Sequence, residues 1–114
     1  MHRLTSHTED LIYDAYDRFR YLGDDTLCRR WVAAQDALQR YYRIDQVLVV
    51  STAWGVDIDN LPAAALRQIA AREGWASFRN SPATRRQLNE LIARRFAAFL
   101  FAVLSAAEAE RARS

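Results

Sequence analysis

Few side chains of this sequence belong to the types that enzymes use as nucleophiles or bases. Cys28 is the only cysteine, and its neighbours Arg29 and Arg30 could make its thiol more reactive. The two histidines, His2 and His7, lie near the start of the chain. Nucleophilic catalysis needs a base beside the nucleophile and a third group that orients the base. We therefore interpret Cys28 as a thiol packed at the edge of the core, and we predict a non-enzymatic protein without catalytic residues.

Histidines and carboxylates are also metal ligands. Those closest together are His2, His7, Glu9 and Asp10. Their spacing matches no known ligand set, and His7 and Glu9 suit helix capping better. The stretch 57–60 resembles only the start of a calcium loop, because the later glycine and glutamate are missing. Asp14 and Asp17 are typical of an exposed polar helix face. The sequence therefore predicts no metal ion and no cofactor.

The composition indicates a globular chain. Its 114 residues are 51% hydrophobic and 26% charged, and we expect them to form a single domain, 1–114. Three glycines and two prolines are too few for the turns of a β-sandwich or barrel. A lone cysteine and the lack of an apolar leader favour a cytoplasmic location. The longest apolar run, 96–107, is shorter than the roughly 20 residues of a membrane span.

Hydrophobic residues at offsets of three and four predict two helices in the first half of the chain. After residues 1–5, which we expect to be frayed, Ser6 to Glu9 has the spacing of a capping box, and Gly23 suits the end of the first helix. A second helix begins within residues 24–26, so the pair should form an antiparallel hairpin. We expect this helix to continue to about Trp54. The alternative is a strand at Val47–Val50 that pairs across a dimer, because a lone two-stranded hairpin is marginal in water.

Two more helices are predicted in the second half. The third begins at Asp59 or Asn60, has Pro62 in its first turn and ends at Gly74. Trp75 and Phe78 should fold back over its end. The fourth is capped by Ser81 and continues to the end of the sequence, and Arg86, Glu90 and Arg94 are spaced as an ion ladder. From residue 96 onward this helix is apolar on every side, which predicts burial on every side. The expected fold is all-α: a small four-helix antiparallel bundle or a related helical fold, possibly an intertwined dimer.

Apolar and aromatic residues without catalytic partners favour a function in protein–protein contact. Tyrosine and arginine dominate interface hot spots, and both occur on the first two helices. The residues expected to contact a partner are Tyr13, Arg20, Tyr21, Arg40, Tyr42 and Arg43. One of Tyr41 and Tyr42 should belong to the core. Self-association as a homodimer is expected through Phe99, Phe101 and Val103. The leading hypothesis is a bacterial or phage regulatory or inhibitory protein, such as an anti-activator, a phage-type inhibitor or an adaptor.

The alternative hypothesis is a nucleic-acid-binding regulator. Residues 1–60 carry seven arginines against ten acids, whereas residues 61–114 carry nine arginines against four acids. Such asymmetry indicates either that the halves attract each other or that the basic half binds a polyanion. The candidate phosphate contacts are Arg79, Arg85, Arg86, Arg94 and Arg95. Ala70 and Gly74 have the spacing of a helix-turn-helix motif, although the link from Gly74 to Ser81 is longer than its usual turn.

Overall fold

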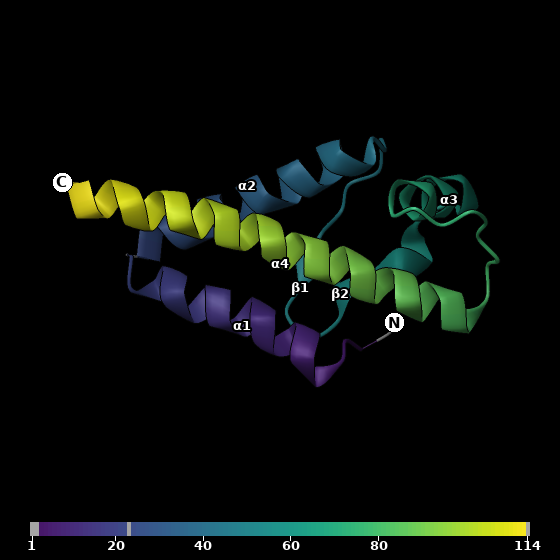
Figure 1. Ribbon diagram of the computed structural model, residues 1–114, viewed down its shortest axis with the longest axis horizontal. Coiled ribbons are helices and arrows are strands. Elements are labelled where there is room, and N and C mark those ends of the chain that lie inside the picture. The colour runs from purple at the N-terminus through teal and green to yellow at the C-terminus, as the bar shows by residue number, and fades with distance from the viewer. Residues whose placement is uncertain (1–2, 23, 114) are drawn as a thin grey trace.

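The computed structural model describes residues 3–22 and 24–113, without the side chains of residues 24–28. The described part is mostly helical, as the sequence predicted (Figure 1). Its helices are α1 (Ser6–Arg20), α2 (Asp24–Tyr42), α3 (Ala63–Arg72) and α4 (Pro82–Arg113). Two short strands, β1 (Val50–Ser51) and β2 (Gly55–Val56), and a 3₁₀ turn, η1 (Ile58–Asn60), lie between α2 and α3. Gly23 and the capping side chains predicted at residues 24–26 lie outside the described part.

Helix α4 is the axis of the molecule. Its 32 residues correspond to a rod of about 48 Å, which matches the 49 Å long dimension of the whole structure. Helices α1 and α2 and strand β2 all pack against it. The predicted start is confirmed, because the Thr84 backbone N–H donates to Ser81 Oγ at 3.2 Å and Pro82 is the first helical residue. The core side chains of α4 are Leu88, Ile92, Ala93, Phe96, Ala97, Leu100, Leu104 and Ala107.

Helices α1 and α4 run in the same direction. Thr8, early in α1, donates to Glu90 at 2.6 Å, and Arg18, late in α1, pairs with Glu108 at 2.7 Å. Helix α2 runs opposite to both (Figure 1). The antiparallel arrangement expected for the whole fold therefore holds for α1 with α2 but is wrong for α1 with α4. The physical reason is the long connection 43–81, which carries the chain back to the end of the molecule where α1 begins.

Residues 4 and 5 are held in place rather than frayed, whereas residues 1 and 2 lie outside the described part. Leu4 is buried, and its backbone N–H donates to the Ala53 carbonyl at 2.8 Å. The N-cap of α1 is Thr5 and not Ser6, since the Thr5 hydroxyl accepts from the backbone N–H of Thr8. Glu90 of α4 then accepts from the hydroxyls of both threonines. A contact from a distant helix therefore shifts the cap by one residue and fixes residues 4 and 5.

Helix α2 ends at Tyr42, twelve residues before the predicted end at Trp54. Arg43 has a positive φ of 56°, which breaks the helix. The following segment forms an antiparallel hairpin within the chain, with Val50 opposite Val56 and Ser51 opposite Gly55. The prediction of a continuous helix is thus wrong, and so is that of a strand that finds its partner in a second copy.

Side-chain amides hold both outer edges of this hairpin. On the α2 side, Gln35 Oε1 accepts from the Val50 N–H at 2.7 Å and Gln39 Oε1 accepts from the Leu48 N–H at 3.4 Å. On the α4 side, Asn89 Oδ1 accepts from the Val56 N–H at 3.0 Å, and Asn89 Nδ2 donates to the carbonyl of Trp54 at 2.8 Å. Unpaired strand edges are normally the weak point of a small hairpin. Here α2 and α4 supply the missing hydrogen bonds.

Helix α3 packs against α2 at one end of the molecule. Its N-cap is Pro62, two or three residues later than predicted, because Asp59 and Asn60 belong to η1. Its predicted end is confirmed. Gly74 has a φ of +86°, its N–H donates to the Ala71 carbonyl, and the next N–H, of Trp75, donates to the Ala70 carbonyl. This pair of bonds is a Schellman motif. The half-buried rings of Trp75 and Phe78 stack 6.3 Å apart, as expected for a link that folds back.

Candidate interaction surface

The residue types considered for catalysis and metal binding do not gather in the described structure. His7 is exposed on α1, and His2 and the side chain of Cys28 lie outside the described part. Among the described residues, no group of three or more His, Cys, Asp or Glu side chains is close enough to hold a metal ion. Within residues 3–22 and 24–113, no helix combines enough length with enough apolar character to cross a membrane.

One polar cluster is buried where α2, the end of α3 and α4 meet. The Tyr42 hydroxyl donates to Glu73 Oε1 at 2.7 Å, and Arg95 donates to both carboxylate oxygens, at 2.6 and 3.1 Å. Burial raises the pKa of the Tyr42 phenol well above its ordinary value, and the adjacent carboxylate adds to this effect. Burial alone would also raise the pKa of Glu73, but the hydrogen bonds from Arg95 and Tyr42 outweigh it and lower that pKa. Glu73 and Arg95 therefore stay charged and paired at neutral pH. The cluster stabilises the contact between α2, the end of α3 and α4.

Tyr42, and not Tyr41, is the core residue of this adjacent pair. Tyr42 was placed on the partner surface, but it is fully buried and cannot contact a partner. Tyr41 is half-buried, and the guanidinium carbons of Arg72 and Arg95 lie 4.5 and 4.2 Å from the centre of its ring. The cause is the position of Glu73, which offers an acceptor to the Tyr42 hydroxyl.

The other residues predicted to contact a partner do not form one surface. Arg20 and the highly exposed Tyr21 lie at the end of α1. Arg40 and Arg43 lie at the far end of α2 and are also exposed. Because the 19 residues of α2 span about 28 Å, the two groups are separated by most of a helix length. Tyr13 lies between them, and its hydroxyl accepts from the Thr52 hydroxyl beside the hairpin at 3.1 Å.

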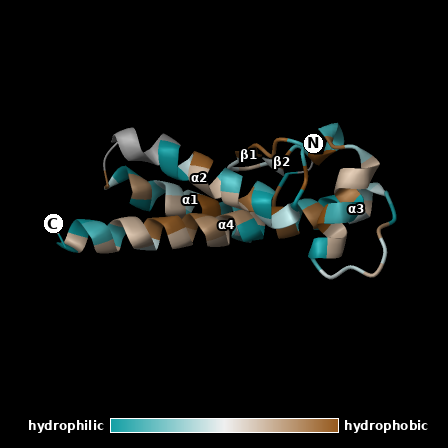
Figure 2. Ribbon diagram, turned by 90° about the horizontal axis from the view of Figure 1, so that it is seen from above, coloured by the Kyte–Doolittle hydropathy of each residue, from teal (hydrophilic) through white to brown (hydrophobic). Residues whose placement is uncertain are grey.

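The most exposed β-branched side chains lie on the segment that leads into β1. Val47 and Val49 are 75% and 63% exposed, whereas the alternating residues Leu48 and Val50 are buried. Figure 2 shows this hydrophobic segment on the side of the molecule that faces away from α4. Val32, Tyr13 and Trp54 are exposed on the elements that contact the segment. We call these five residues the hairpin face: Tyr13, Val32, Val47, Val49 and Trp54.

Sequence reasoning found only Tyr13 among the members of the hairpin face. Val47, Val49 and Trp54 were missed because residues up to Trp54 were assigned to a helix, and Val32 was not singled out within α2. The available signal was the run of residues 47–50, which is rich in β-branched side chains and therefore typical of a strand.

The residues expected to drive self-association are half-buried within the chain. Phe99 packs edge-on against Tyr41, with ring centres 6.1 Å apart, and the guanidinium of Arg18 lies 5.7 Å from the ring centre of Phe101. Val103 lines an open depression of about 270 Å³ together with Arg29, Arg30 and Ala33. Helices α1 and α2 thus cover α4 only in part. The predicted burial of α4 on every side is wrong, because Ala98, Ala102 and Ala106 are exposed.

The arginines of residues 79–95 divide into two groups. Arg85 pairs with Asp59 at 3.1 Å, Arg95 pairs with Glu73, and Arg94 donates to the Thr8 hydroxyl at 3.4 Å. The predicted ion ladder with Arg86 is absent among the described residues, because Glu90 turns toward the start of α1. Arg79 and Arg86 are exposed, and Arg94 is also exposed despite its hydrogen bond.

Comparisons with known proteins gave no match. No protein-family model matches the chain, and no curated protein or solved structure is similar to it at a significant level.

Proposed function

We propose that this protein is a non-enzymatic regulatory or inhibitory protein that binds another protein through the hairpin face. The single observation that supports the proposal is the exposure of Val47 and Val49 on a segment whose alternate side chains are buried. Apolar residues grouped on the surface of a small protein are typical of a contact site. Tyr13 and Trp54 add aromatic side chains of the kind that anchor interfaces.

The hydrogen bonding of the hairpin indicates how a partner would bind. The N–H groups of Leu48 and Val50 donate to glutamines of α2, and that of Val56 donates to Asn89. An added strand therefore cannot pair with these N–H groups. The partner would pack against side chains, with the exposed Arg40 and Arg43 at the rim of the contact.

A homodimer is the second part of the proposal, since the same face could bind a copy of itself. A symmetric contact would bury Val47 and Val49 of both copies without unfolding either one. The four helices would then form part of a larger assembly. Light scattering across a concentration series tests this point, and a strict monomer at high concentration would exclude it.

The test of protein binding uses two matched double variants. Val47→Glu with Val49→Glu places two charges on the hairpin face, and Ala98→Glu with Ala102→Glu places two charges on exposed positions of α4. Immobilised wild-type protein and the α4 variant should capture the same partner from nuclease-treated host extract, and the hairpin-face variant should lose it. Equal capture by all three proteins at similar Tm would contradict the proposal.

A further inference from the structure

The end of the molecule formed by α3, the link 73–81 and the start of α4 has an excess of positive charge. Residues 61–95 contain seven arginines and two glutamates, and no aspartate. Both glutamates point into the structure, since Glu73 binds Tyr42 and Arg95, and Glu90 binds Thr5 and Thr8. The negative charges of this segment are therefore engaged, and they do not cover the surface arginines.

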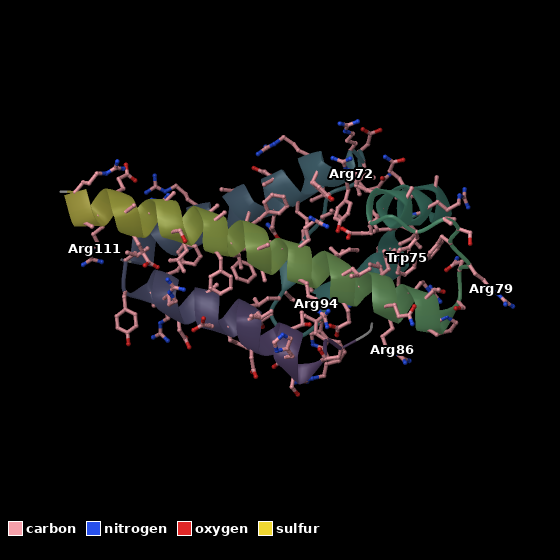
Figure 3. All side chains as sticks on the ribbon, viewed as in Figure 1. Arg72, Trp75, Arg79, Arg86, Arg94 and Arg111 are labelled. Atoms are coloured by element: carbon pink, nitrogen blue, oxygen red, sulfur yellow. The ribbon has the colours of Figure 1, made fainter. Side chains whose placement is uncertain are left out.

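Five arginines of this segment are exposed: Arg67, Arg72, Arg79, Arg86 and Arg94. In Figure 3, Arg79 and Arg86 extend away from the ribbon where the link joins α4, and Arg72 lies on the opposite side, near α2. Arg85 lies in the same turn of α4 as Arg86 and is half-buried against Asp59. We call Arg79 and Arg86 the arginine end. The other exposed arginines strengthen the positive potential around it.

We propose that the arginine end binds the phosphate backbone of a nucleic acid. Guanidinium groups fit phosphate oxygens in bidentate geometry, and this chain contains no lysine that would offer only a point charge. Spaced arginines on a loop and a helix are the pattern of backbone contacts, which position a nucleic acid without reading its sequence.

The distribution of apolar residues favours a nucleic acid over an acidic protein at this end. The large hydrophobic side chains that are exposed in the described part lie on α1, on α2 and between residues 47 and 54. A protein interface needs desolvated apolar anchors at its centre. Phosphate binding needs none, because its free energy comes mainly from the release of counterions.

The acidic side of α1 limits where the nucleic acid can lie. Asp10, Asp14 and Asp17 are exposed at offsets of four and three, which places them on one face of α1. Their charges repel phosphates, so the backbone should cross the α3 end and avoid α1. The inference is independent of the hairpin face, which lies on other elements.

The test measures the binding of a labelled 20-nucleotide single strand and of the matching duplex by fluorescence anisotropy, between 50 and 200 mM salt. Arg79→Gln with Arg86→Gln is compared with Arg20→Gln with Arg113→Gln, which removes the same charge from exposed positions elsewhere. Each lost phosphate contact should reduce the magnitude of the slope of log K against log salt by about 0.9 for the duplex and about 0.7 for the single strand. The first pair should therefore lose about 1.8 and about 1.4 of this slope, respectively, and bind about tenfold or more weakly at 50 mM. The second pair should behave much like the wild type.

Several outcomes would overturn the inference. They are no anisotropy change at 50 mM salt with 100 µM protein, equal losses in both double variants, or displacement of the oligonucleotide by polyglutamate at equal charge concentration. The last result would indicate an acidic protein as the ligand. Val47→Glu with Val49→Glu should leave the anisotropy signal nearly unchanged, so that failure of this inference and failure of the proposed protein contact are distinguishable. Thermal unfolding of each variant confirms that it is folded.

Discussion

The side-chain oxygen of Asn89 lies 2.7 Å from the place where a β-carbon on residue 55 would stand. Gly55 also has a φ of +69°, in the left-handed region that residues with a side chain rarely adopt. Since Asn89 bonds the Val56 N–H and the Trp54 carbonyl, it cannot move aside without losing both hydrogen bonds. The close approach of α4 to the hairpin therefore requires glycine at position 55.

Gly55→Ala and Gly74→Ala form a matched pair that separates backbone strain from steric clash. Both glycines have positive φ, but a β-carbon at residue 74 would meet no atom within 4 Å. We expect Gly74→Ala to lower the free energy of unfolding by about 1–2 kcal/mol, the cost of the left-handed conformation. Gly55→Ala should cost about 1–3 kcal/mol more, because the added atom overlaps a fixed side chain. Urea denaturation measures both values, and equal losses would contradict the role of Asn89.

Gln35→Ala should weaken the hairpin locally. Its carbonyl oxygen accepts from the buried N–H of Val50 at 2.7 Å, and a buried donor without an acceptor costs about 1–3 kcal/mol. Gln39→Ala is the control, because its bond to the Leu48 N–H is longer, at 3.4 Å. Hydrogen exchange should show the Val50 amide losing protection in the first variant and keeping it in the second. Unchanged protection of Val50 in both variants would show that the strand edge does not depend on α2.

Glu73→Gln should change the stability of the protein in acid. The folded pKa of Glu73 lies below its unfolded value, so the carboxylate contributes stability above the unfolded pKa of about 4.3 and loses it as the pH falls through the folded value. We expect the variant to be about 1–3 kcal/mol less stable at pH 7, and the difference from wild type to shrink below about pH 4. Urea midpoints between pH 7 and pH 3 provide the measurement. A difference that stays constant over this range would mean that the charge of Glu73 does not contribute.

Tyr42→Phe should change the stability of the protein in alkali. The pKa of Tyr42 is raised by burial and by Glu73, so the phenol contributes stability up to its unfolded pKa of about 10, and this contribution is lost as the pH rises further. At pH 7 the variant should be less stable by about 0.5–1.5 kcal/mol, through the lost hydrogen bond to Glu73. Above about pH 10 the difference in stability between wild type and variant should narrow. In an absorbance titration, wild type should show one tyrosine that ionises only on unfolding, and the variant should not.

Local signals predicted much of the helical structure. Ser81 with Pro82 marked the start of α4, and Gly74 marked the end of α3, because each residue acts through atoms within a few positions of itself. These features need no knowledge of the rest of the fold.

Contacts between distant residues decided what the sequence did not reveal. The hairpin depends on Asn89, which lies 33 residues beyond Val56. The choice between Tyr41 and Tyr42 depends on where Glu73 comes to rest, and the cap at Thr5 depends on Glu90. The hairpin face was missed because the end of α2 was misplaced. Val47 and Val49 can be recognised as surface residues only when α2 ends at Tyr42.

Helix α4 follows in the sequence the elements that pack against it, and this order affects how the molecule can fold during synthesis. During synthesis, α1, α2 and the hairpin emerge from the ribosome before the helix on which they all pack. Until α4 follows, Ile12, Phe19 and Leu38 lack much of their apolar surroundings, and the strand edge at Val56 has no Asn89. A nascent chain that stops before residue 82 should therefore remain unfolded and bind chaperones, and the native structure of this part should form only after α4 has emerged.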